Sequence, residues 1–176
     1  MNIENLLNFG FRTLNFFKIK TPQLDSEILL SEVIKKNRKY FILNPKEHVD
    51  IKYLKSFHSL IERRKKGEPI AYIINKKEFW KQKYYVDKNV LIPRPDTEHL
   101  VEEVLNFTDQ NSRLHILDIG TGSGCILLSV LKERKNFKGV GIDISKKSLN
   151  ISKYNAKKLN LENRVKFYIS DVDNFL

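Results

Sequence analysis

Apolar residues recur at helical spacing through the first seventy residues. The first such segment carries on one face Leu6, Leu7, Phe11 and Leu14. Thr21 and Pro22 then supply an N-cap and a first-turn proline for a second segment over residues 22–33. Asp50 can cap a third segment, which ends before Gly67. The pattern predicts a small bundle of three or four amphipathic helices.

From Glu68 the pattern changes to aromatic and β-branched residues. Polar breaks at residues 75–77 and 87–89 predict a short antiparallel hairpin that links the bundle to the C-terminal half of the chain. Pro93 excludes a central strand beyond it, and Asp96 or Thr97 can cap the next helix.

The remaining residues alternate between strand and helix patterns. Strands are expected in residues 114–120, 138–144 and 164–170, and Ser145 is expected to cap the helix before the last of them. The strands are mostly apolar on both faces, which is typical of a parallel sheet with right-handed crossovers. The predicted fold class is therefore α/β.

Three glycines follow the first of these strands in the sequence "ILDIGTGSG", residues 116–124. Gly120, Gly122 and Gly124 lie at a strand-to-helix turn, where a nucleotide-like ligand approaches the backbone of a doubly wound sheet. A dinucleotide site needs G-x-G-x-x-G, but here Cys125 stands where the third glycine belongs. No Gly-Lys-Ser/Thr follows, so the phosphate-binding P-loop pattern fails as well.

Two carboxylates flank this loop. Asp143 ends the second strand, where an acidic side chain can accept hydrogen bonds from both ribose hydroxyls, each worth about 1.5–3 kcal/mol. Asp118 would repel a pyrophosphate but would favour a ligand with an ammonium and a sulfonium group, such as S-adenosylmethionine. A simpler interpretation remains open, in which the glycines only permit close helix packing and both aspartates are solvated strand ends. After the third strand, Asp171 could reach an adenine amino group and Val172 could pack on the ring.

Composition narrows the function classes. The net charge of +11 is spread over the chain, with 14 basic and 8 acidic side chains in residues 1–70 and 18 and 13 in the rest, so nucleic-acid binding is not favoured. The dense run Arg63 to Lys66 is expected to be a solvated helix end, with a contact for an acidic partner as the alternative. Cys125 is the only cysteine and is expected to be inert; no metal motif is present, and no apolar run is long enough to cross a membrane.

Several blocks together resemble the protein-(glutamine-N5) methyltransferases of peptide chain release factors, the HemK/PrmC family. They are "DSEILL", "RRKKGEPIAYI", "EFW", "LIPRPDTE", "LDIGTGSG" and "GIDIS", and the resemblance runs from about Asp25 to the last residue. It implies a helical docking domain over residues 1–70, a β-hairpin linker over 71–92 and the first part of a Rossmann-like SAM-dependent methyltransferase domain over 93–176.

The resemblance also implies the activity: methylation of the glutamine in the Gly-Gly-Gln loop of release factors, in the cytoplasm, by a monomer without direct contact to nucleic acid. S-adenosylmethionine would be the cofactor, and the residues that match the family's site are Gly120, Thr121, Gly122, Ser123, Gly124, Asp143 and Val172. Arg94, Thr97 and Glu98 fall in a family block near the site, without individual roles.

The family's Asn-Pro-Pro-Tyr motif, which holds the substrate amide, does not occur in the 176 residues. We therefore expect an incomplete chain that methylates nothing alone, and we assign no catalytic residue. Two alternatives remain open: an adenine-N6 methyltransferase of DNA or RNA, and a non-catalytic module that binds release factors.

Overall fold

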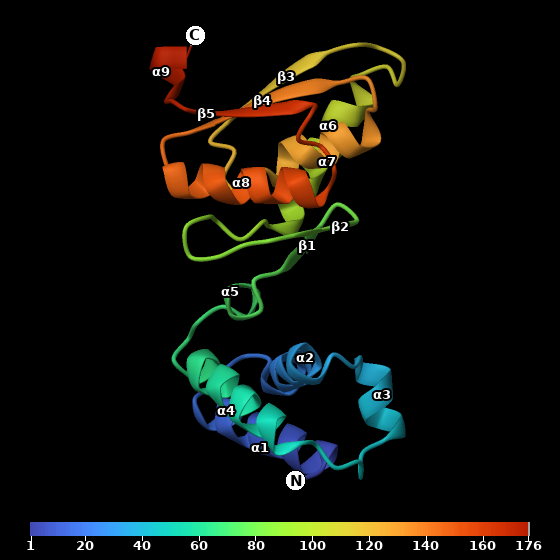
Figure 1. Ribbon diagram of the computed structural model, residues 1–176, viewed down its shortest axis with the longest axis vertical. Helices are drawn as coiled ribbons and strands as arrows, with labels where there is room; N and C mark the ends of the chain where they lie inside the picture. The colour runs from blue at the N-terminus through green and yellow to red at the C-terminus, as the bar shows by residue number, and fades with distance from the viewer. Residues whose placement is uncertain (176) are drawn as a thin grey trace. The chain divides into compact units, whose positions relative to one another are not determined.

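The computed structural model describes residues 1–175, and the chain divides into two units, Met1–Ile74 and Asn75 onward (Figure 1). The first unit is helical and the second contains the two sheets. This order confirms the predicted α/β class with a helical N-terminal part. No helix of the described residues is long and apolar enough to cross a membrane.

The helical unit contains five helices: α1 (Ile3–Phe16), α2 (Pro22–Ile34), α3 (Arg38–Leu43), α4 (Ile51–Lys65) and the short α5 (Ile70–Ile73). The start of α4 follows the sequence pattern, because the Asp50 carboxylate accepts a hydrogen bond from the backbone N–H of Lys52 at 3.1 Å. Thr21 precedes α2 as expected, but its side chain makes no capping bond. Its hydroxyl instead donates to Asp25 Oδ1 at 2.9 Å.

The core of this unit forms where α1, α2 and α4 meet. Gly10 lies at the crossing, and a Cβ there would come within 2.8 Å of Ser26 Oγ on α2 and 3.0 Å of Phe57 Cζ on α4. The missing side chain therefore sets how closely the three helices pack. The fully buried apolar residues around this point include Leu6, Leu14, Leu29, Leu30, Phe57 and Ile61.

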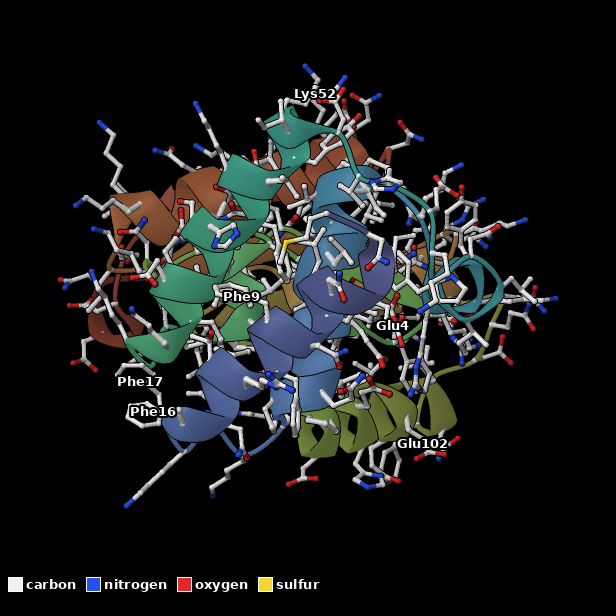
Figure 2. The ribbon with its side chains drawn as sticks, turned by 90° about the horizontal axis from the view of Figure 1, so that it is seen from below. Glu4, Phe9, Phe16, Phe17, Lys52 and Glu102 are labelled. Carbon is white, nitrogen blue, oxygen red and sulfur yellow. The ribbon has the colours of Figure 1, made fainter. Side chains whose placement is uncertain are left out.

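The basic run at the end of α4 is not the solvated helix end that we predicted. Arg64 Nε lies 2.7 Å from Asp25 Oδ2, and Asp25 is only 4% exposed. Arg63 pairs with Glu68, and Lys65 lies over the ring of Phe17 beyond the end of α1, beside Phe16 (Figure 2). The first three members of the run therefore have partners within the helical unit.

The described residues of the second unit form ten elements: β1 (Lys77–Phe79), β2 (Gln82–Tyr84), η1 (Pro95–Thr97), α6 (Glu98–Asn106), β3 (His115–Ile119), α7 (Cys125–Glu133), β4 (Lys138–Asp143), α8 (Lys146–Lys158), β5 (Val165–Ile169) and α9 (Val172–Phe175). Strands β3, β4 and β5 form a parallel sheet in that order. The Ser145 side chain caps α8 as predicted, by accepting from Ser148 N at 3.2 Å.

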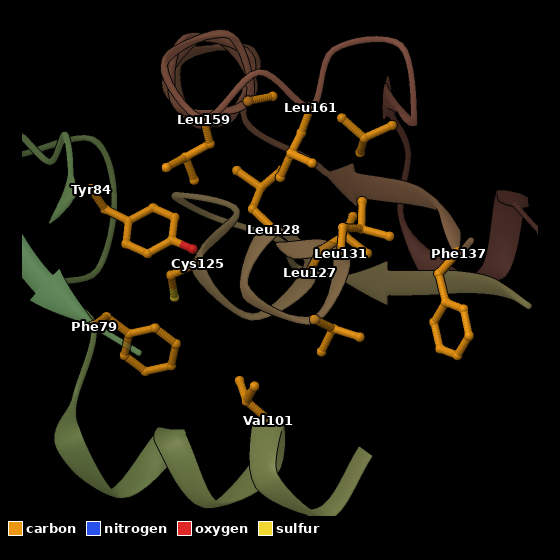
Figure 3. Close-up of a cluster of buried hydrophobic side chains, with 13 residues drawn as sticks. Phe79, Tyr84, Val101, Cys125, Leu127, Leu128, Leu131, Phe137, Leu159 and Leu161 are labelled. Carbon is orange, nitrogen blue, oxygen red and sulfur yellow. The ribbon is translucent and has the colours of Figure 1, made fainter. Parts of the chain in front are cut away.

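The hairpin β1–β2 packs into the core of this second unit. Figure 3 shows Phe79 and Tyr84 facing α7 and Val101 of α6, and the Tyr84 hydroxyl lies 2.7 Å from Ser129 Oγ. Its strands have only three residues each, and the turn between them uses Trp80 and Lys81, whose φ angles are +44° and +62°. The polar break expected over residues 75–77 was placed one residue too far, because Lys77 is already the first residue of β1.

Helices α6, α7 and α8 lie on one face of the parallel sheet (Figure 1). No element of the described residues covers the other face, where Ile119 is 51% and Tyr168 46% exposed. The strands were predicted to be apolar on both faces, and in the structure only one of those faces is covered. The carboxyl ends of the three strands meet at one edge of the sheet.

The buried Asp25–Arg64 ion pair should contribute strongly to the stability of the helical unit. Replacing Arg64 by alanine should lower the free energy of unfolding by about 3 kcal/mol, because Asp25 would stay buried without its charged partner. Replacing the neighbouring Arg63 should cost under about 1 kcal/mol, since its partner Glu68 is partly exposed. Urea denaturation followed by circular dichroism measures both, and equal losses would contradict this interpretation.

Candidate cofactor-binding site

The glycine loop, residues 120–124, connects β3 to α7 at the carboxyl edge of the sheet. Gly120, Gly122 and Gly124 have φ angles of +73°, +55° and +78°, a region that other residues rarely adopt. The backbone N–H groups of Gly120 and Thr121 both donate to the Ile142 carbonyl at 2.9 Å. The loop is therefore tied to the end of β4.

The three glycines serve different purposes. A Cβ at Gly120 would meet nothing within 4 Å, and one at Gly122 would meet only the Gly120 carbonyl at 3.8 Å. A Cβ at Gly124 would instead lie 3.0 Å from Leu128 Cδ1 and 3.2 Å from Ser152 Cβ. Bare backbone thus faces open space at Gly120 and Gly122, whereas Gly124 permits close packing against α7 and α8.

The side chains of Thr121 and Ser123 are buried, at 6% and 3% exposed. Thr121 Oγ1 donates to Asp118 Oδ2 at 2.7 Å. Gly141 leaves room for this hydroxyl, because a Cβ at Gly141 would lie only 3.0 Å from Thr121 Oγ1. At these two positions the open side of the loop is therefore formed by backbone.

The Asp143 side chain connects the loop after β3 to the loop after β4. Its Oδ2 accepts from Gly122 N at 3.0 Å, and its Oδ1 accepts from Ser145 N at 2.8 Å. A carboxylate oxygen has two lone pairs, so each oxygen retains capacity for a further donor. The side chain predicted to hold a ribose is thus oriented by two backbone groups and can still accept hydrogen bonds from a ligand.

Asp118 is the second carboxylate at the edge. Burial raises the pKa of Asp118, and the nearby charge of Asp143 adds to the rise, while the Thr121 hydroxyl opposes it. Two acidic groups whose charges repel each other create a site that favours a cationic ligand.

The third loop of the edge carries Asp171 and Val172. Ser170 N donates to the Asp143 carbonyl at 3.3 Å, which places the end of β5 beside the end of β4. Asp171 Oδ1 accepts from Asn174 N at 2.9 Å, so this carboxylate caps α9. Val172 is 40% exposed.

The block at residues 94–98 has a visible structural role. Glu98 Oε1 accepts from the backbone N–H of Trp80 at 3.1 Å, and the Trp80 indole donates to Glu133 at 3.0 Å. These contacts hold the hairpin turn with its left-handed residues. Arg94 is exposed, and Thr97 makes no side-chain capping bond to α6.

Sequence reasoning missed Asn155 on α8. This side chain is fully buried and bonds to the Ser123 carbonyl of the glycine loop at 2.9 Å. Its spacing from Leu149 and Ser152 puts it on the buried face of α8, so helical periodicity could have marked it as an interior polar residue.

Comparison with known families assigns both units. Residues 110–176 match a family described as a methyltransferase domain, and residues 5–74 match the PrmC N-terminal domain. The sequence is 43% identical over 97% of the chain to a release factor glutamine methyltransferase from Buchnera aphidicola subsp. Acyrthosiphon pisum. It is 45% identical over 98% of the chain to one from Clostridium acetobutylicum. The chain spans 60% of the length of each of these two curated relatives.

A solved SAM-dependent methyltransferase from Geobacter sulfurreducens in complex with S-adenosyl-L-homocysteine is also similar, with 25% identity and a TM-score of 0.40. That likeness covers 47% of this chain and 32% of the other.

The parallel sheet, its glycine loop and the family match make the second unit part of a methyltransferase domain. The PrmC N-terminal domain precedes it, and nearly the whole chain is similar in sequence to several release factor glutamine methyltransferases.

Cys125 should react slowly with alkylating reagents. It is 8% exposed, and burial raises its pKa from 9.0 to about 11. At pH 8 this leaves about a hundredfold less thiolate than in the unfolded chain, so the native protein should react at least about a hundred times more slowly. Iodoacetamide labelling with and without urea measures the ratio, and equal rates would contradict the buried position.

Replacing Asp118 by asparagine should stabilise the ligand-free protein at neutral pH. The folded-state pKa of Asp118 lies above its unfolded value, so the protonated form is favoured on folding and stability falls as the pH rises through this window. Asparagine keeps an acceptor for Thr121 without the charge. The gain in melting temperature should be largest near pH 7 and should fade at acidic pH; a gain independent of pH would contradict this cause.

Proposed function

We propose that the carboxyl edge of the parallel sheet binds S-adenosylmethionine. The observation that carries the proposal is the bare backbone at Gly120 and Gly122 beside two carboxylates, of which Asp143 is already oriented by backbone donors. Asp143 would accept from the ribose hydroxyls, and the loop Gly120–Gly124 would line the ribose and methionine portions. Val172 would contact the adenine.

The electrostatics of the edge support a cationic cofactor over a phosphorylated one. A pyrophosphate would lie against the charges of Asp118 and Asp143, whereas a sulfonium and an ammonium group would be attracted to them. The bound cofactor supplies an electrophilic methyl group on sulfur. The described residues contribute binding, orientation and the negative potential.

We further propose that the methyl group goes to the side-chain amide of the glutamine in the Gly-Gly-Gln loop of peptide chain release factors. The similarity to release factor glutamine methyltransferases supports this substrate, and the helical unit, which matches the PrmC N-terminal domain, would help to dock it. An amide nitrogen is a weak nucleophile, so orientation against the sulfonium methyl must supply much of the rate. Such an enzyme would act in the cytoplasm as a monomer, without direct contact to nucleic acid.

Asp143 offers the sharpest test of the cofactor site. Replacing it by alanine should weaken binding of S-adenosylhomocysteine by about 10- to 100-fold, the loss expected for hydrogen bonds to a charged acceptor. Asparagine, which keeps one acceptor oxygen, should have a smaller effect. Ser148→Ala on α8 serves as the control, since its hydroxyl bonds to the Asn89 carbonyl and the residue is not part of the proposed site.

Isothermal titration calorimetry gives the three affinities, and circular dichroism checks that each variant is folded. Unchanged affinity of folded Asp143→Ala would refute the proposed site.

Transfer specificity is tested on the relative from Buchnera aphidicola subsp. Acyrthosiphon pisum, of which the present chain spans 60%. Incubation with methyl-labelled cofactor should label its release factor and leave DNA and RNA unlabelled. Label only in nucleic acid would favour an adenine-N6 methyltransferase. The relative could also label neither substrate, while the present chain retains release factor in a pull-down. That pair of results would favour a non-catalytic binding module.

A further inference from the structure

We infer that Asn155 is a positioning residue that fixes the shape of the glycine loop through the Ser123 carbonyl. The inference rests on the proposed cofactor site only where it predicts a change in ligand affinity. The contact itself is a property of the ligand-free protein.

The carboxamide of Asn155 bonds to two separate segments. Its Oδ1 accepts from Tyr85 N at 2.7 Å, and its Nδ2 donates to the Tyr85 carbonyl at 3.0 Å. The same Nδ2 donates to the Ser123 carbonyl at 2.9 Å. Since Asn155 is 0% exposed, water does not compete for these groups.

Asn155 contacts the glycine loop at the peptide between Ser123 and Gly124. The peptide between Ser123 and Gly124 lies among glycines with positive φ, so the local chain offers little resistance to rotation of this peptide plane. Its N–H donates to the Thr121 carbonyl at 2.7 Å, and its C=O accepts from Asn155. The two bonds hold the plane from both sides, and Asn155 is the partner from outside the loop.

The orientation of this plane bears directly on the proposed site. Gly122, the residue before Ser123, donates its N–H to Asp143 Oδ2 and presents its backbone to open space. A loop held in this shape before binding does not have to be ordered by the ligand, which raises affinity. Asn155 also makes the loop depend on the segment after β2, through Tyr85.

Ser148 provides a matched control on the same helix. It is 5% exposed, and its Oγ donates to the Asn89 carbonyl at 2.9 Å, so it also joins α8 to the segment after the hairpin. This hydrogen bond does not involve the glycine loop. A purely structural role for Asn155 predicts that both residues affect stability and neither affects the loop specifically.

The first experiment uses the ligand-free protein with ¹⁵N-labelled glycine. Asn155→Ala and the near-isosteric Asn155→Asp, which keeps the acceptor for Tyr85 N but loses the donor to Ser123, should shift or broaden the amide signals of Gly122 and Gly124. Ser148→Ala should leave both signals in place. Unmoved Gly122 and Gly124 signals in folded Asn155 variants would overturn the inference, whatever the protein binds.

The second experiment measures affinity for S-adenosylhomocysteine by calorimetry. Folded Asn155→Ala and Asn155→Asp should bind about tenfold more weakly, and Ser148→Ala within about twofold of the parent, even where urea denaturation shows similar losses of stability. Equal affinities for all the variants would overturn the positioning role. No binding by the parent protein, together with shifted glycine signals, would refute the proposed cofactor site and leave the coupling intact.

If both Asn155 variants fail to fold, the parent protein still decides the question. The two carboxamide protons of Asn155 should exchange slowly with solvent and show a nuclear Overhauser effect to the Gly124 amide. Rapid exchange at the rate of exposed side-chain amides would contradict the coupling.

Discussion

The Asp143 carboxylate is the interaction on which the geometry of this edge depends. It accepts from Gly122 N in the loop after β3 and from Ser145 N at the start of α8. The loops that follow two neighbouring strands are therefore held by one carboxylate, which is oriented before any ligand arrives. The left-handed glycines make this possible, because they let the backbone N–H of Gly122 turn toward β4.

The same edge carries negative charges that lower the stability of the empty protein and favour a cationic ligand. Asp118 is partly buried and its pKa is raised, so holding it ionised near Asp143 costs free energy in the empty protein. A cationic ligand removes part of that cost when it binds. Charges that destabilise the empty protein and are neutralised by a ligand are typical of functional sites. They are not expected in a loop whose role is only structural.

Local signals explain most of what the sequence predicted. Asp50, Ser145 and the spacing of apolar residues depend on neighbours within one helical turn, and they are found as expected. The Trp80–Lys81 turn was missed because neither residue favours positive φ, and Glu98 and Glu133 from distant segments hold it. Arg64 was taken as solvated because Asp25, its partner, lies 39 residues away. The residues at the candidate site were named from a motif, but Asn155 was not, because its contacts come only from tertiary packing.

The most direct test of the proposed cofactor edge is a titration of the glycine-labelled protein with S-adenosylhomocysteine, followed by nuclear magnetic resonance. We predict saturable shifts of the Gly120 and Gly122 amide signals, while those of Gly10 and Gly67 in the helical unit stay fixed. Shifts of equal size at all seven glycines, or none at Gly120 and Gly122 at saturating ligand, would contradict the proposed edge.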